Sequence, residues 1–108
     1  MMEPLLVLTN LPDVASAEKL AHALIESRAA ACVNVLAACR SIYRWEGAVE
    51  TAEEIPLLIK TTRAAYPLVE EIVRVLHPYD VPELIAIPIT HGLPAYLGWL
   101  ATETDKHD

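Results

Sequence analysis

A histidine in a proline-rich stretch is the first candidate for chemistry in this chain. Residues 76–85 read LHPYDVPELI, so His77 stands between the end of an apolar helical pattern and a loop that contains Pro78 and Pro82. Each proline fixes its own φ and biases the preceding residue toward an extended conformation, so few loop conformations are open. The imidazole can serve as a metal ligand, as a general base, or as a helix C-terminal residue whose charged form favours the helix dipole.

Two cysteines, Cys32 and Cys39, are the second candidates. Seven residues of extended strand would separate them by roughly 23 Å and place them on opposite faces, so they can bridge or share a metal only if the strand is broken between them. Two cysteines in a chain expected to be cytoplasmic are predicted to stay reduced. Free cysteine is also among the most buried residue types, so core packing is the alternative role for Cys32.

Lys60 is the third candidate, because it follows an apolar run on a strand that is predicted to be central. A lysine there must lie at a solvent-exposed end of the strand or form an ion pair with an acidic residue. One interpretation is a pocket for a small anionic ligand. It would be lined by Lys60, Tyr79, Glu83 and an aromatic residue such as Trp45 or Trp99 from a neighbouring chain. The alternative is a structural ion pair at a subunit interface.

Catalysis is not indicated by any motif. The sequence contains no G-x-S-x-G nucleophile elbow, no H-E-x-x-H zinc motif and no phosphate-cradling glycine loop, and it has only three glycines. We therefore expect a binding protein and not an enzyme.

The candidate residues must be positioned by an alternation of strand-like and helix-like segments. Apolar patterns predict strands over residues 4–10, 31–46, 48–62 and 83–90, with a tight turn at Gly47. Helical spacing predicts helices over 14–28, from about Pro67 to the residue before His77, and over 94–103. This order predicts an α+β, ferredoxin-like βαββαβ fold with an antiparallel sheet and a C-terminal helix. The continuous apolar runs mark the first and third strands as central, and Pro88 marks the last as an edge.

Length and charge narrow the function classes. The 108 residues predict a single domain over residues 1–108. Fifteen acidic residues against eight basic ones give a net charge of −7. This charge argues against nucleic acid as the main binding partner and favours cations as ligands. We expect no membrane partner and a cytoplasmic location, because no apolar run could span a bilayer and no export signal is recognised.

Two features predict a homo-oligomer. Helices cover only one face of such a sheet, although the strands offer apolar side chains to both faces, so the second face needs a partner. The hairpin arms, about fifteen residues each, would reach roughly 45 to 50 Å if straight. Tyr43 and Trp45 on this hairpin are interpreted as anchors of a subunit interface, most simply in a closed ring. The alternative is a bulge near residues 37 and 38 that folds the arm back onto its own domain.

Five segments together resemble the CutA family of divalent-cation tolerance proteins. They are SIYRWEGAVE (41–50), LLIKTT (57–62), LHPYDVPELIAIPI (76–89), AACVN (30–34) and PAYLGWL (94–100). The resemblance implies a ferredoxin-like subunit in a tight homotrimer with a shape like that of the PII signalling proteins. It also implies a link to copper tolerance and copper binding.

The resemblance implies site residues as well. Cys32 and His77 match family positions associated with copper, and a thiolate with an imidazole suits copper or another borderline divalent cation. Thr9 stands where some bacterial members carry a further cysteine, so one thiolate ligand is absent. The leading hypothesis is a cytoplasmic homotrimer that binds divalent cations, copper first, and contributes to metal tolerance. The alternative is a PII-like signalling or scaffold trimer that binds a small molecule or a partner protein at clefts between subunits.

Overall fold

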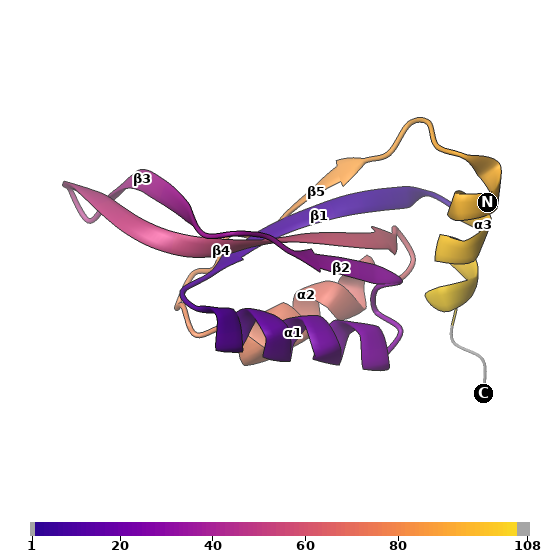
Figure 1. The fold of residues 1–108 in the computed structure, drawn as a ribbon, viewed down its shortest axis with the longest axis horizontal. Coiled ribbons are helices and arrows are strands. Elements are labelled where there is room, and N and C mark those ends of the chain that lie inside the picture. The colour runs from indigo at the N-terminus through magenta and orange to yellow at the C-terminus, as the bar shows by residue number, and fades with distance from the viewer. Residues whose placement is uncertain (1, 106–108) are drawn as a thin grey trace.

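The computed structural model describes residues 2–105, in which an antiparallel sheet carries two helices on one face and a third helix beside one end (Figure 1). In chain order the elements are β1 (Pro4–Leu11), α1 (Val14–Glu26), β2 (Cys32–Val35), β3 (Cys39–Trp45), β4 (Ala48–Thr62), α2 (Tyr66–Leu76), β5 (Ile85–Pro88) and α3 (Pro94–Glu103). This order confirms the predicted α+β class. The predicted strand over 31–46 is divided into β2 and β3, and β5 is shorter than the predicted 83–90.

The strand order is β2-β4-β1-β5, with β3 paired to the remaining length of β4, and every pair is antiparallel. β1 and β4 are therefore central, as their continuous apolar runs predict. β5 lies at an edge, where proline is tolerated because one side of the strand has no neighbour. The predicted βαββαβ arrangement is thus the one observed, and α3 follows the last strand.

One face of the sheet forms the core with α1 and α2. Side chains alternate along β1, and those on this face are Leu5, Val7, Thr9 and Leu11. Their partners across the ladder to β4 are Thr61, Ile59, Leu57 and Ile55. The helices contribute Ala17, Leu20, Leu24, Val69 and Val73 to the same cluster. The alternate side chains of the strands and the apolar side chains along one face of each helix therefore pack together in one core.

Thr9 is the buried residue whose side chain has no hydrogen-bond partner among residues 2–105. It is 1% exposed, and burying an unpaired hydroxyl costs about 1–3 kcal/mol. Because valine has a similar shape without the hydroxyl, we expect Thr9→Val to raise the free energy of unfolding by about 1 kcal/mol. Urea denaturation at a fixed protein concentration measures this change. A less stable variant would show that the hydroxyl is bonded in solution.

The opposite face of the sheet is largely uncovered. The register places Leu6, Leu8, Leu58, Ile85 and Ile87 on this face. Ile85 and Ile87 are 49% and 45% exposed, and α3 packs only near the end of the sheet that holds Cys32. Within one chain, the predicted bare apolar face is therefore present.

The hairpin of β3 and β4 projects beyond the domain, and the long axis of the chain measures 44 Å (Figure 1). Trp45 pairs with Ala48, and the two turn residues, Glu46 and Gly47, have φ values of 49° and 82°. Both values are positive, as in a two-residue type I′ turn, which confirms the predicted hairpin position.

A bulge separates β2 from β3. Val35 pairs with Leu57 and Cys39 pairs with Glu54, so three residues on one strand oppose two on its partner. The break falls beside Pro56, which has no N–H to donate, although its carbonyl accepts from the Leu36 N–H. The bulge of the alternative interpretation is therefore present, but the arm stays paired with β4 and does not fold back onto its own domain.

Helix ends follow local chemistry. The Asp13 side chain accepts a hydrogen bond of 2.7 Å from the Ser16 N–H and caps α1. The helix ends at Glu26, two residues before the predicted limit, because Arg28 has a left-handed φ of 63°. Among the described residues, no helix is long and apolar enough to cross a bilayer.

Candidate functional site

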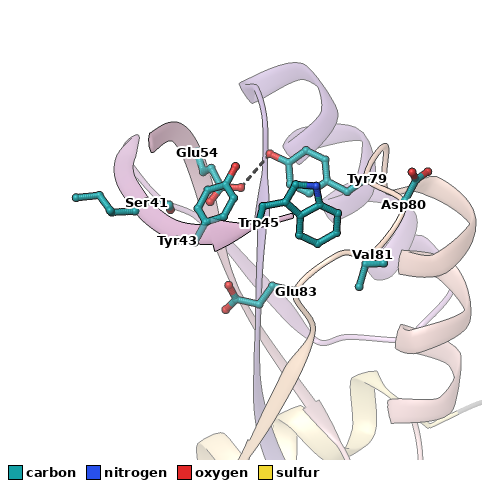
Figure 2. A pocket seen from close by; sticks show the side chains of 9 residues that line it. Ser41, Tyr43, Trp45, Glu54, Tyr79, Asp80, Val81 and Glu83 are labelled. Carbon is teal, nitrogen blue, oxygen red and sulfur yellow. Dashed lines mark hydrogen bonds between the residues drawn. The ribbon is translucent and has the colours of Figure 1, made fainter. Parts of the chain in front are cut away.

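A pocket of about 600 Å³ opens at the base of the hairpin (Figure 2). Its lining comprises Ser41, Ile42, Tyr43 and Trp45 from β3, Glu54 from β4, and Tyr79, Asp80, Val81 and Glu83 from the loop after α2. Every charged residue in this lining is acidic. The pocket therefore combines aromatic walls with carboxylates and is suited to cationic guests.

Tyr79 and Glu54 are joined inside the pocket. The Tyr79 hydroxyl donates a hydrogen bond of 2.9 Å to Glu54 Oε2, as the dashed line in Figure 2 shows. Burial, together with the hydrogen bond to Glu54 and the charge of Glu54, raises the pKa of Tyr79 to about 12. The phenol therefore stays protonated and acts as a donor at any physiological pH.

His77 lies behind the pocket and is only 7% exposed. Its Nδ1 accepts from the Tyr79 N–H at 3.2 Å, so its Nε2 carries the proton and donates to the Asn10 carbonyl at 2.7 Å. Burial lowers the pKa of His77, although the Asn10 carbonyl and the charge of Glu54 act in the opposite direction. His77 ends α2, as predicted, but it does so as a buried neutral ring and not as a charge on the helix dipole.

A chain of hydrogen bonds links Glu83, at the rim of the pocket, to Tyr79 by way of Asn10 and His77. The Asn10 side-chain amide donates to Glu83 Oε1 at 3.2 Å, and the backbone carbonyl of Asn10 accepts from His77. The His77 and Tyr79 rings are also in contact, with centroids 4.8 Å apart. His77 is therefore a positioning residue, because it holds Tyr79 against Glu54 and ties the loop to β1.

The two predicted metal ligands are not brought together within one chain. Cys32 pairs with Lys60, which pairs with Leu6, whereas His77 contacts Asn10. Four residues of β1 therefore separate the two positions, which is about 13 Å along the strand. Within residues 2–105, no three His, Cys, Asp or Glu side chains are grouped so that they could hold a metal ion.

The two cysteines are free and partly buried. The bulge breaks the strand between them, as a bridge would require, but they form no disulfide. Cys32 lies on the sheet face opposite α1 and α2, at the end beside α3, where Tyr96 is its neighbour. Cys39 lies within hydrogen-bonding reach of Ser41, at 3.8 Å between Sγ and Oγ. Neither cysteine is a core residue, so the core-packing alternative for Cys32 is wrong in the single chain.

The predicted anion pocket is only partly assembled. Three of its residues, Trp45, Tyr79 and Glu83, line the observed pocket. Lys60 lies elsewhere and donates a hydrogen bond to the Asn34 side chain, so its observed partner is an amide and not an acid. Trp99 belongs to α3, where its ring lies 5.6 Å from the Tyr96 ring, and a contribution from it across a subunit boundary stays a prediction. Without Lys60, the charged residues that line the pocket of one chain are all acidic, and the anionic ligand of a pocket shared with a neighbouring chain stays a prediction.

Glu54 is the functional candidate that sequence reasoning missed. It stands in the segment TAEEI (51–55) next to a second glutamate, and a glutamate is usually exposed, yet Glu54 is only 7% exposed here. The only sequence signal is the strand spacing of two, which places Glu54 on the same face of β4 as Ala52 and Glu50. Its burial depends on Tyr79, which is 25 residues away in sequence.

Comparison with known proteins adds independent evidence. Residues 5–103 match the sequence model of the family described as "CutA1 divalent ion tolerance protein". A Thermus thermophilus protein named "Divalent-cation tolerance protein CutA" is 48% identical over 98 residues, which cover 91% of this chain and 95% of that protein.

Solved structures agree with the sequence match. The divalent cation tolerance protein Cut A1 from Thermus thermophilus superposes with a TM-score of 0.92 at 47% identity, covering 97% of this chain and 100% of that one. The protein from Archaeoglobus fulgidus called "Periplasmic divalent cation tolerance protein CutA" superposes with a TM-score of 0.91 at 32% identity, covering 94% and 99%. The similarity therefore spans nearly the whole chain.

Proposed function

Because the chain belongs to the CutA1 family of divalent ion tolerance proteins, we propose that it binds divalent cations, copper first, and contributes to metal tolerance. The observation that carries this proposal is the near full-length identity of 48% to a protein named for divalent-cation tolerance. A net charge of −7 supports it, since an acidic protein attracts cations. The proposed role is binding, with no catalytic step.

Metal ligation in this proposal involves more than one copy of the chain. A single chain groups no three suitable ligands among residues 2–105, whereas Cys32 is only partly buried, beside α3 on the sheet face opposite α1 and α2, and a second copy could supply further ligands there. A thiolate is a preferred ligand of copper. His77 could join such a site only by giving up its bond to Asn10 or to Tyr79.

The proposed assembly is a homotrimer of the PII-like shape that the family resemblance implies. The apolar face opposite α1 and α2 and the projecting hairpin support it, because both expose large apolar side chains to water. On the hairpin, Ile42 and Val49 are 68% and 66% exposed, and Tyr43 and Trp45 are 42% and 48% exposed. A closed ring would bury these surfaces without leaving an open edge.

A cytoplasmic location is part of the proposal. Two free thiols fit a reducing compartment. The Archaeoglobus fulgidus relative is called periplasmic, so fractionation of cells that express the tagged protein is the direct measurement.

Copper titration of two cysteine variants tests the metal proposal. Cys32→Ser removes the half-buried thiol beside α3, and we expect it to weaken copper binding at least about 10-fold, since the serine hydroxyl is a poor copper ligand. Cys39→Ser is the matched control, because it removes the second half-buried thiol and should leave the affinity unchanged. Competition with a chromophoric copper chelator at pH 7.5 gives both affinities.

His77→Gln completes the copper experiment. Since both ring nitrogens are already bonded within the chain, we expect this variant to bind copper as the wild type does. A loss of affinity equal to that of Cys32→Ser would assign the ring to the metal. Equal binding by all four proteins would instead remove Cys32 from the proposed site.

A second candidate function is favoured by the pocket itself. A volume of about 600 Å³ with aromatic walls is in the range of small-molecule sites. This feature supports the alternative of a signalling or scaffold trimer that binds a small molecule, and it does not depend on copper.

A further inference from the structure

We propose that the hairpin of one copy packs its aromatic side chains against α3 of the next copy, so that head-to-tail contacts between the two ends of the chain close the proposed trimer. The inference rests on that trimer and deepens it, because it names the two surfaces that meet at each subunit boundary. Three observations and one condition of symmetry carry it.

The first observation concerns α3. Residues 94–102 read PAYLGWLAT and contain no charged side chain, yet the buried residue of this helix is Leu100. The α3 stripe, which consists of Leu93, Tyr96 and Trp99 at intervals of three, lies along one side of the helix and is exposed. The centroids of the Tyr96 and Trp99 rings are 5.6 Å apart, so the stripe presents a continuous aromatic surface. A helix that is apolar on all sides is normally covered on all sides, and the α3 stripe therefore needs a partner surface.

The second observation is the position of the hairpin. Its β3 arm exposes Ile42, Tyr43 and Trp45, and it projects at one end of the long axis of the chain, whereas α3 lies at the other end (Figure 1). Since this axis measures 44 Å, the two surfaces cannot meet within one chain. Aromatic side chains are enriched where they are buried between chains. Each end of the chain thus offers an apolar surface that a second copy can cover.

The third observation is charge. β3 carries Arg40 and Arg44 and no acidic residue, and both arginines are exposed. The ion pairs within residues 2–105 involve other arginines. α3 carries no basic residue, and its charged residue is Glu103, whose side chain is 43% exposed. Because the β4 arm carries Glu50 and Glu53, it is the β3 arm whose charge is complementary to α3.

The condition of symmetry concerns a ring of three. Such a ring of identical chains is closed by heterologous contacts, in which two different surfaces of each chain meet. The hairpin of one copy therefore needs a partner other than the hairpin of the next copy. The uncovered sheet faces lie between the two ends of each chain and can meet one another around the three-fold axis. This arrangement leaves α3 as the apolar end surface for the hairpin.

Cross-linking separates a head-to-tail contact from other arrangements. Both native cysteines are first changed to serine, and thiols are then introduced by Ser41→Cys on β3 and Ala95→Cys on α3. Ser41 lies on the same face of the hairpin as Tyr43, and Ala95 is exposed one turn before Trp99. With a flexible bis-maleimide, we expect covalent dimers and trimers on denaturing gels from the double variant. A link within one chain is excluded because the two sites lie at opposite ends of the molecule.

The single variants are the controls for this geometry. Neither Ser41→Cys nor Ala95→Cys alone should link two copies. Covalent dimers from Ser41→Cys alone would show a contact between hairpins and overturn the proposal. A double variant that sediments as a trimer but gives no covalent product would also overturn it. Ser41→Cys with Val75→Cys is the matched control and should stay unlinked, since Val75 is exposed on α2.

Replacement of Trp99 by alanine tests the same contact without a cross-linker. Sedimentation across a dilution series should show association at least about 10-fold weaker than in the wild type. Because Trp45 and Trp99 share one contact in the proposal, Trp45→Ala combined with Trp99→Ala should lose at most about 3-fold more than the larger single loss. Losses at separate surfaces multiply, so multiplied losses would overturn the proposal.

Leu93→Ser keeps the test independent of helix stability. Leu93 is the N-cap of α3, where serine is favoured, so this variant removes an exposed apolar side chain and should leave the circular dichroism unchanged. We expect association to weaken at least about 5-fold. Unchanged association in both Leu93→Ser and Trp99→Ala would overturn the contact. A monomeric wild type would overturn the proposed trimer as well, whereas a trimer without a link between hairpin and α3 would overturn the contact alone.

Discussion

Replacement of Trp45 by alanine is expected to shift the protein from the proposed trimer to monomers at micromolar concentration. The indole is 48% exposed in the single chain, on a hairpin that projects from the domain (Figure 1). Loss of an aromatic anchor at the centre of an interface costs about 2 kcal/mol or more, which is roughly a 30-fold weaker association. Sedimentation velocity across a dilution series measures the shift.

Val75→Ala is a suitable control for this assembly experiment. Val75 is 71% exposed on α2, which lies against the sheet face opposite the proposed interface. This variant should assemble as the wild type does. A wild-type protein that sediments as a stable monomer would contradict the trimer, and a Trp45→Ala protein with unchanged mass would remove Trp45 from the interface.

Replacement of His77 by alanine is expected to lower the free energy of unfolding by about 2–4 kcal/mol. The ring is 7% exposed, donates to the Asn10 carbonyl and accepts from the Tyr79 N–H. Truncation would leave a cavity and two buried backbone groups without partners. Urea denaturation at pH 7.5 gives the change. A loss below about 1 kcal/mol would correspond to a charge–dipole effect and would contradict the bonded role described above.

The pH dependence of stability gives a second measurement on His77. Burial lowers the pKa of the folded ring, whereas an unfolded histidine titrates near pH 6.5. Between these two values the unfolded state binds more protons, so the free energy of unfolding falls as the pH decreases. The contribution of the neutral His77 ring to the free energy of unfolding is complete above pH 6.5. It is lost as the pH falls through the pKa of the folded state, and it changes no further below that pKa.

Denaturation at intervals from pH 7.5 to pH 5.0 tests this dependence. In His77→Gln the slope should flatten, because glutamine does not titrate. His22→Gln is the matched control, since His22 is exposed on α1, and it should keep the wild-type slope. An equal slope in the wild type and in His77→Gln would assign the pH dependence to other groups.

The sequence by itself determined the elements and their order. Continuous apolar runs identified β1 and β4 as central strands, Pro88 placed β5 at an edge, and Gly47 located the hairpin turn. These features depend on local chemistry, namely on side-chain period, on the missing proline N–H and on backbone freedom, so they can be read without long-range contacts. The family could be identified for the same reason, because its segments are contiguous.

Tertiary structure alone decided which side chains meet. Glu54 is buried because Tyr79 reaches it from a loop 25 residues later, and the buried His77 ring is held in place by a hydrogen bond to the carbonyl of Asn10, 67 residues earlier. Lys60 and Cys32 are neighbours across two strands and are therefore remote from the pocket loop. Such contacts depend on strand register and on how the loop after α2 packs against β1, and no local spacing encodes either. The absence of Lys60 from the pocket lining of one chain follows from this physical difference.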